Sequence, residues 1–486
     1  MSRIYCDTNI YSIVFNKNHK SYTEDLKDTF ESLKDKILFP FSEAHIMDLH
    51  NSLEEKRNEQ LIFMKRYTKD NYFTYDVAEK ELKCYLATPL EAYKGKDFDS
   101  YNNFMAYPFD INNFMNFGED DEFHETETIY KNTINLIFNQ PFTNMIPIPS
   151  NLDDKSLEFY NKFFPQNKNL SLGELVNHAM NYGLELLNDS KAVTDLRNYV
   201  ASYINRDEYS FEKWGEEFDK KLKETSFNQT FSEIFEKTNE INNKKNSNYD
   251  SFILYYNLLE LLNVTREKSG GKTKKFNLNS LNADANHAYY ASMSDYLVTD
   301  DKGLQVKAFL VYRYFNIPTK ILSSKDFANY RSIFLNQEER DQKTFFDSVL
   351  HEIDTSLLLI DQFDLRTNSR VLTYKPSYTF FNFFDRFQAA INDNYIKMVF
   401  YRRRVGYLYR ELELMVNKFI ILFGLDIHNQ GIFDFENETE WQDNIIREWK
   451  IGKAEVVLAF SENSPKLFVT IFKNSPEESF NELLLK

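Results

Sequence analysis

The stretch Arg3-Ile4-Tyr5-Cys6-Asp7-Thr8-Asn9 decides how the rest of the chain is interpreted. Its apolar core is typical of a short buried strand, which ends at an aspartate, and Thr8 or Asn9 can cap a helix that follows. In open α/β sheets the carboxyl ends of the strands face the crevice where ligands bind. An aspartate after a strand is also a common helix N-cap, so Asp7 alone does not distinguish a catalytic role from a structural one.

The residues that follow alternate between helix and strand patterns. We predict a helix over 22–35, a strand over 37–41, and a helix that is capped by Ser42 and runs to about residue 66. The same character returns later in the chain, with helices over 250–263, 283–293 and 302–315 and strands over 296–299 and 318–322. This alternation is typical of βαβ units and a parallel sheet, so the predicted fold class is α/β.

The length of 486 residues exceeds the size at which a single core usually stops growing, and three parts are expected. The α/β domain is discontinuous, over 1–75 and 250–330, and a largely helical insertion over 76–249 divides it. The C-terminal part, 331–486, is expected to be an α+β domain. It contains a predicted long helix over 388–424 and a β-hairpin formed by 455–460 and 466–472.

Composition sets limits on partners and location. The net charge of −16 makes the protein a poor general binder of polyanions, so any nucleic-acid contact needs a local basic groove. Two cysteines cannot form a disulfide framework, which favours a reducing, cytoplasmic location. We expect no signal peptide, because Asp7 interrupts the apolar start, and no membrane span, because no apolar run is long enough.

A second acidic block lies nearly three hundred residues after the first. Asp284 begins a stretch rich in small residues, and Thr299-Asp300-Asp301 follows the apolar run Tyr296-Leu297-Val298. Carboxylates at strand ends and on adjacent helices are the oxygen ligands that Mg²⁺ or Mn²⁺ prefers. The sequence therefore predicts a hydrolytic metal site made from two distant segments.

These blocks resemble the PIN-domain family of metal-dependent ribonucleases. In that family an aspartate ends the first strand, a second acid lies on a helix within a Ser-(x)₅-Glu-Leu pattern, a third begins a small-residue helix, and a fourth ends a Thr-x-Asp. The matching positions here are Asp7, Asp48, Asp284 and Asp301. Asp48 replaces the usual glutamate, and the long insertion also departs from the family. The resemblance covers roughly residues 1–70 and 250–325 and implies a PIN-like three-layer fold with a parallel sheet.

The resemblance also implies roles for these residues. Asp7, Asp284 and Asp301 are expected to bind the metal ion, and Asp48 completes the catalytic set. Thr8, Asn9 and Thr299 are expected to orient the acids through their hydroxyl or amide groups. Glu43 remains an alternative to Asp48, and Asp300 to Asp301. His45 and His287 lie three residues from Asp48 and Asp284 on the same helix faces, where packing or hydrogen bonding is the ordinary role.

Two basic segments are candidate nucleic-acid contacts. Lys272, Lys274 and Lys275 lie in a predicted loop, which is not a P-loop because Arg266 stands where that motif needs its first glycine. Arg402, Arg403 and Arg404 lie among tyrosines, a combination that single-strand binders use. A solvated loop and a basic helix face over an aromatic core are the structural alternatives.

The sequence thus favours an endonuclease that cuts phosphodiester bonds with Mg²⁺ or Mn²⁺, most often RNA in families of this kind. Nucleic acid is the expected partner, and a toxin-like role would add a protein regulator or antitoxin. The competing hypothesis is a binding or assembly module with a degenerate PIN fold, which the acidic charge and the Asp48 replacement favour.

Overall fold

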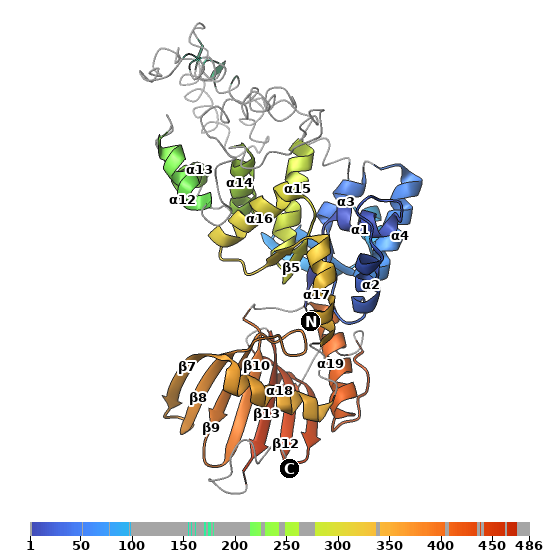
Figure 1. Cartoon of the computed structure of the whole chain (residues 1–486), viewed down its shortest axis with the longest axis vertical. Coiled ribbons are helices and arrows are strands. Elements are labelled where there is room, and N and C mark those ends of the chain that lie inside the picture. Colours follow the sequence, from blue (N-terminus) through green and yellow to red (C-terminus); the bar gives the residue numbers. More distant parts are fainter. Residues whose placement is uncertain are drawn as a thin grey trace, which may run out of the picture.

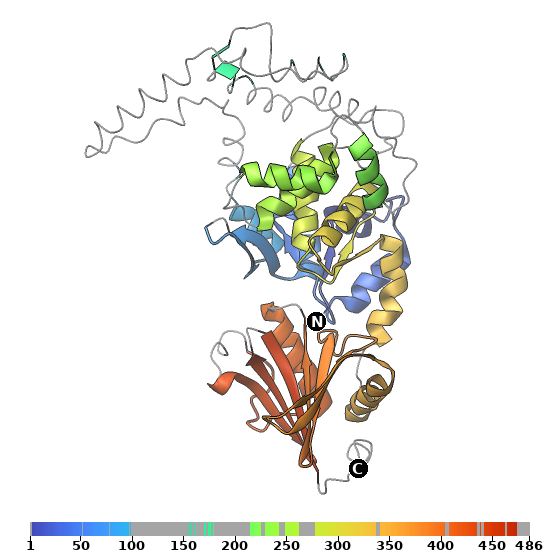
Figure 2. The same cartoon turned by 90° about the vertical axis from the view of Figure 1, so that its left-hand side faces the viewer.

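The computed structural model describes a mixed α/β chain, drawn in two views in Figures 1 and 2. The described residues are 2–50, 52–76, 78–96, 98, isolated positions between 154 and 178, 214–224, 229–242, 248–261, 278–336, 341–403, 408–434, 438, 442–461 and 464–473. Within these residues no helix is both long enough and apolar enough to cross a bilayer.

The first region is α/β and combines residues from both sides of the middle segment. Its elements before residue 100 are β1 (Ile4–Cys6), α1 (Thr8–Phe15), α2 (Glu24–Leu33), β2 (Phe41–Ser42), α3 (Glu43–His50), α4 (Glu54–Thr68), β3 (Asn71–Asp76), β4 (Glu81–Leu86) and α5 (Pro89–Lys94). Its later elements are α12 (Trp214–Glu224), α13 (Phe231–Asn242), α14 (Asn248–Leu261), α15 (Leu278–Ala291), β5 (Tyr296–Val298), α16 (Lys302–Tyr314), β6 (Lys320–Leu322) and α17 (Ser324–Asn336).

Strand β1 joins the two halves of this region. It pairs in parallel with β5, with Cys6 opposite Val298, and β5 pairs in parallel with β6. On its other side a parallel bridge connects Arg3 to Leu38, shortly before β2 begins a second sheet of order β2-β3-β4. The carboxyl ends of β1 and β5 therefore lie side by side, and Asp7 and Asp301 follow them.

The two faces of β1 belong to different cores. Tyr5 packs in a cluster with Leu297, whereas Ile4 and Cys6 pack in a cluster with Phe30. Strand residues that alternate between two buried faces are expected where helices cover both sides of a sheet. The cluster of Tyr5 also contains side chains from α12, α13 and α14, so the core of the α/β region extends back to Phe218.

The second region is a seven-stranded antiparallel sheet with two helices. Its elements are α18 (Gln342–Thr355), β7 (Leu357–Asp364), β8 (Ser369–Lys375), β9 (Arg386–Ile391), β10 (Tyr395–Tyr401), α19 (Tyr409–Phe423), the 3₁₀ turn Gln442–Asn444, β11 (Ile445–Ile451), β12 (Ala454–Ser461) and β13 (Ser464–Phe472). The strand order is β11-β12-β13-β10-β9-β8-β7. Side chains of α18 and α19 share one core with the sheet, as Phe345 and Phe419 illustrate.

A buried ion-pair network connects the two regions beside the chain's N-terminus, which lies between them in both views (Figures 1 and 2). Arg3 at the start of β1 donates to both carboxylate oxygens of Glu411 on α19, each at 2.7 Å. Arg402, just after β10, bonds to Glu411 at 3.2 Å and to Asp295 at 2.6 Å. Glu411 has no exposed surface and Arg3 only 1%, so this contact is part of the molecule's interior.

Three local predictions are corrected. The helix expected from residue 43 to about 66 is two helices, α3 and α4, because the chain turns at Ser52, whose N–H bonds to the carbonyl of Leu49 at 3.0 Å. The segment expected as a strand over 37–41 forms a ladder only at Phe41–Ser42. The hairpin of β3 and β4 lies partly in the segment expected to be helical.

The largest difference concerns 388–424, where a single long helix was expected. Strands β9 and β10 occupy its first half, and α19 is the one helix among its described residues, 388–403 and 408–424. Buried residues alternate along β10, at Ile396, Met398 and Phe400, which is the period of a half-buried strand rather than of a helix. The C-terminal hairpin is confirmed, since β12 and β13 pair antiparallel.

Candidate active site

Asp7 lies at the junction of β1 and α1 and is 3% exposed. It caps α1 by accepting the N–H of Ile10 at 3.1 Å, and its second oxygen accepts the hydroxyl of Thr299. The parallel register makes this contact unavoidable, because Cys6 is opposite Val298 and the next residues of each strand face each other. Burial raises the pKa of Asp7 to about 6, although His287 and the Thr299 hydroxyl act in the opposite direction.

Asp301 lies three residues after the end of β5. It caps α16 through the N–H of Leu304 at 2.9 Å, and its own N–H donates to the Thr299 hydroxyl at 3.1 Å. Thr299 is fully buried and therefore links Asp7 to Asp301 through one oxygen. Asp300, the alternative acid, instead accepts the N–H and hydroxyl of Ser324 at 2.8 and 2.6 Å, which fixes the start of α17.

Asp48 on α3 meets His287 on α15. The His287 Nε2 atom lies 2.9 Å from an Asp48 carboxylate oxygen. Burial would lower the pKa of His287, but the carboxylates of Asp48, Asp7 and Asp284 raise it above its ordinary value. Burial would raise the pKa of Asp48, but His287 lowers it. Each side chain thus favours the charged form of the other; the Asp48 side chain is 30% exposed and that of His287 only 3%.

Asp284 lies one turn before His287 on α15 and completes the acidic set. Burial raises the pKa of Asp284 to about 7, and the neighbouring carboxylates of Asp301 and Asp48 act in the same direction. The charges of buried Lys307 and of His287 oppose this rise. Like charges so placed favour a proton or a cation at the site. The four predicted acids thus belong to one electrostatically coupled cluster, with His287 among them.

A chain of buried hydrogen bonds begins at the other ring nitrogen of His287. Its Nδ1 lies 2.8 Å from the Tyr5 hydroxyl, which in turn lies 2.6 Å from the Ser42 hydroxyl. His45 Nδ1 accepts the N–H of Ser42 at 3.0 Å, so its Nε2 carries the proton and donates to the carbonyl of Cys6 at 2.7 Å. Burial, with the charge of His287, lowers the pKa of His45 to about 3, and this ring is neutral.

Tyr5, Ser42 and Lys307 were not predicted as members of the site. One signal for Tyr5 was available, because it lies two residues before Asp7 in a strand and so shares a face with it. His45 and His287 have the hydrogen-bonding role that the helix spacing predicted, but their connection through Tyr5 depends on three separate segments. No spacing rule along the sequence predicts such a contact.

Glu43, the alternative second acid, belongs to a different group. Its carboxylate forms an ion pair with Lys96 and accepts the hydroxyls of Thr74 and Tyr290, each at 3.2 Å. Asp48, by contrast, contacts the histidine that the other acids influence. The structure therefore favours Asp48 as the second acid of the cluster.

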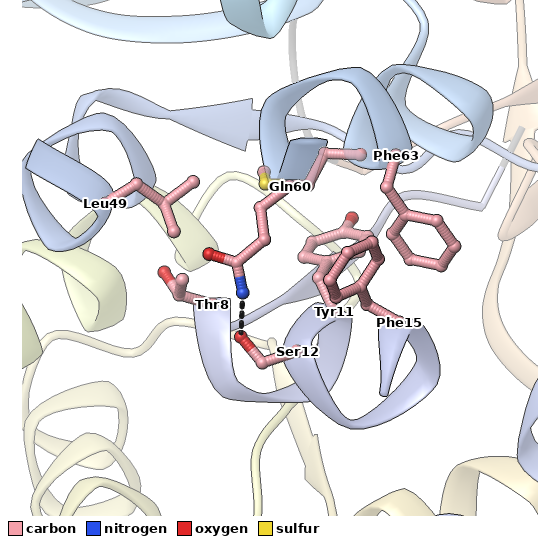
Figure 3. Close-up of a pocket in the computed structure, with 8 residues that line it drawn as sticks. Thr8, Tyr11, Ser12, Phe15, Leu49, Gln60 and Phe63 are labelled. Atoms are coloured by element: carbon pink, nitrogen blue, oxygen red, sulfur yellow. Dashed lines mark hydrogen bonds between the residues drawn. The ribbon is translucent and has the colours of Figure 1, made fainter. Parts of the chain in front are cut away.

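The residues expected to orient the acids are placed differently. Thr299 bonds to Asp7 directly, and the Thr8 hydroxyl lies 3.3 Å from His287 Nε2. Asn9 lies on the exposed side of α1. Behind Thr8 is the apolar hollow of Figure 3, where Gln60 Nε2 donates to the Ser12 hydroxyl at 3.3 Å. This hollow is too small to hold a water molecule, so it is packing and not a ligand pocket.

Most of the basic residues that were predicted to contact nucleic acid are either buried or outside the described residues. Arg402 is 7% exposed and is bound to Asp295 and Glu411, so its guanidinium serves the interface between the regions and not a phosphate. Arg403 is exposed, and its backbone N–H bonds to Asp385 at 2.8 Å. Arg404, Lys272, Lys274 and Lys275 lie outside the described residues.

The acidic cluster offers carboxylate oxygens, which are the ligands that a hard divalent cation prefers. Burial and mutual repulsion disfavour the charged form of Asp7 and Asp284, and a bound cation would compensate for this. Within the described part of the chain, no three acidic, histidine or cysteine side chains are arranged to hold a metal ion. Mg²⁺ usually takes one or two carboxylates and keeps several waters.

Comparison of the chain with protein-family models, with curated proteins and with solved structures gave no match.

Proposed function

We propose that the α/β region is a Mg²⁺- or Mn²⁺-dependent endonuclease of the PIN-like kind, with RNA as its preferred substrate. One observation carries the proposal. The carboxylates of Asp7, Asp48 and Asp284, which come from three segments up to 277 residues apart in the sequence, all raise the pKa of His287, and the carboxylate of Asp301 helps to raise the pKa of Asp284. Clusters of this kind concentrate at functional sites, because they are unfavourable for stability alone.

The sheet topology supports the same proposal. Asp7 and Asp301 follow adjacent parallel strands, and ligands of open α/β sheets bind beyond the carboxyl ends of such strands. Both acids also cap helices, so their backbone positions are fixed by α1 and α16. A rigid backbone on each side is what a site needs to hold its carboxylates in place.

Each member of the cluster has a role in this proposal. Asp7 and Asp301 would hold the cation directly and Asp284 would orient its waters; the cation would supply an activated water and stabilise charge on the phosphate. Thr299 orients Asp7 and Asp301 through its hydroxyl oxygen. His287 donates a hydrogen bond from Nε2 to Asp48. Asp48 is the more exposed of the two, so it is the group that can exchange this proton with substrate or water.

A binding module with a degenerate site is the second candidate function. This function is favoured because two acids of the cluster already have partners within the protein. His287 pairs with Asp48, and the Thr299 hydroxyl donates to Asp7. The net charge of −16 also disfavours general nucleic-acid binding. In that case the cluster would serve to hold α3, α15 and the sheet together.

The experiment that separates these functions is cleavage of labelled single-stranded RNA and DNA by the full chain with Mn²⁺, Mg²⁺ or EDTA. Asp7→Asn and Asp301→Asn should each lower metal-dependent cleavage by about 100-fold or more, because even residues that only support metal ligands are worth 10–100-fold. Asparagine still caps a helix, so both variants should fold.

The matched control is Asp341→Asn, which changes the capping aspartate of α18 in the other region. It should leave cleavage unchanged. Wild-type cleavage that survives in both site variants, or that persists in EDTA, would refute the metal mechanism. Metal-independent folding with no cleavage and no bound cation in calorimetry would favour the binding module.

A further inference from the structure

A second hollow, here called the β6 groove, runs along the free edge of the sheet β1-β5-β6. Its volume is about 590 Å³, and it lies between α16 and α17 with β6 as its floor. The side chains that matter below are Lys302, Phe309, Arg313, Lys320, Asp326 and Tyr330. Since β6 is the edge strand, this side of the sheet is not covered by a further strand in the described part of the chain.

The charge of the groove is opposite to that of the whole protein. Lys302 begins α16, Arg313 lies in its last turn, and Lys320 begins β6, and all three are exposed. They face one carboxylate, Asp326, which is already engaged by the hydroxyl of Ser323 at 2.6 Å. An excess of cations on an acidic protein indicates a site for an anionic ligand.

Aromatic side chains also line the groove. Tyr330 on α17 is half-buried and its ring packs 6.4 Å from that of Tyr296, over which the Lys320 ammonium lies at 5.8 Å. Phe309 lines the groove from α16 and is also partly exposed. Cations that follow a backbone and rings that stack on bases are the two components of single-strand nucleic-acid binding.

One end of the groove adjoins the candidate active site along the chain. Lys302, which lines the groove, directly follows Asp301, and Ser323, which also lines it, precedes Ser324, whose hydroxyl donates to Asp300 at 2.6 Å. From there the groove follows α16, whose 13 residues span roughly 20 Å at the helical rise. A strand bound along it would therefore reach the acidic cluster at one end.

An added peptide strand fits this edge less well. Peptides that extend a sheet rely on main-chain hydrogen bonds to a long edge strand, and β6 has only three residues. A peptide also has no general need for the cations that line the groove.

We propose that the β6 groove binds the sugar–phosphate backbone of single-stranded RNA next to the bond that is cut. This inference rests on the proposed nuclease function and identifies where its substrate lies. Arg313 and Lys320 contact phosphates, Tyr330 stacks on a base, and Lys302 guides the strand toward Asp301.

The test is equilibrium binding of a fluorescent single-stranded RNA in EDTA, measured by anisotropy at several salt concentrations, so that no cleavage is needed. The double variant Arg313→Gln/Lys320→Gln should weaken binding at least about fivefold and reduce the salt slope by about 1.4, since each phosphate contact on a single strand contributes about 0.7. Arg313→Lys/Lys320→Arg should restore both values. Lys220→Gln/Lys223→Gln on α12, also exposed, removes the same charge elsewhere and should change neither.

The outcomes separate this inference from the proposed function. If the wild type binds RNA through Arg313 and Lys320 but never cuts it, the groove is supported and the nuclease is not. If the wild type cuts RNA with metal while the groove variants bind and cut it equally well, the groove proposal is overturned. Equal weakening by the α12 control would also overturn it, because binding would then follow net charge alone.

Discussion

The two regions bury ionisable groups in opposite ways. In the sheet region two buried groups of charges pair with opposite charges: Arg447 lies 3.5 Å from Asp426 and is bound to Glu438, while Glu411 lies between Arg3 and Arg402. In the α/β region Asp284 lies near Asp301 and Asp48, so acids are placed beside acids.

The pKa values report this difference. Although burial acts in the other direction, Arg3 and Arg402 lower the pKa of Glu411 to about 2. Burial and neighbouring carboxylates raise the pKa of Asp284 to about 7. Opposite charges in contact stabilise the fold, whereas like charges need a proton or a ligand, so only the second arrangement is evidence for a function.

The largest effect is expected from Glu411→Gln, which tests whether the paired charges are structural. It leaves two buried arginines with too little negative charge and should cost about 3–5 kcal/mol of unfolding free energy at pH 7. Because the folded pKa of Glu411 lies below its ordinary 4.5, its contribution is present above pH 4.5 and is lost as the pH falls toward 2. The variant should lack this part of the acid dependence in urea unfolding.

Glu413→Gln is the matched control for this change. Glu413 lies two residues further on α19 and pairs with Arg410, but its side chain is 33% exposed. Its loss should cost less than about 1 kcal/mol. Equal effects of the two substitutions would contradict the distinction between buried pairing and surface pairing.

A smaller effect of opposite sign is expected from Asp284→Asn in EDTA. The folded pKa of about 7 lies above the ordinary 3.8, so the carboxyl contributes stability below pH 3.8 and loses it as the pH rises through 7. The variant should therefore be on the order of 2 kcal/mol more stable than wild type at pH 8 and no more stable at pH 4. A variant less stable at pH 8 would show that the acids hold the fold together.

The smallest effect is expected at the edge of the sheet region, from Leu359→Lys on β7. Leu359 is 45% exposed, and exposed apolar residues continue along this edge strand. The change should alter the unfolding free energy by less than about 0.5 kcal/mol. Leu458→Ala in the core, at 0% exposure, should cost about 2–5 kcal/mol, and comparison of the two melting curves checks it.

The parallel strands β1 and β5, their capping acids and the pairing of the two distant blocks are predictable from sequence. An apolar run that is followed by Asp, as at β1, predicts both the strand and the cap of the next helix from adjacent residues. A related pattern follows β5, where Thr299 and Asp300 separate the strand from Asp301, which again caps a helix. Because parallel strands share one edge, the approach of these two acids follows from the fold class itself.

Contacts that depend on which elements become neighbours are not predictable in this way. Asp48 and Glu43 lie on one helix, and only the position of α15 and Lys96 decides their partners. The strands β9 and β10 were misinterpreted because a short apolar run looks alike in a helix and in a strand. The role of Arg402 depends on Asp295, which is 107 residues away, and no periodicity in the local sequence predicts that contact.

The bond between Arg3 and Glu411 also sets an order of events during synthesis. Glu411 follows Arg3 by 408 residues, which is roughly 20–80 s of translation. Until α19 has left the ribosome, Arg3 beside β1 cannot be buried against this carboxylate. The four aspartates are all made before that point, so the acidic residues are present before the contact that joins the two regions.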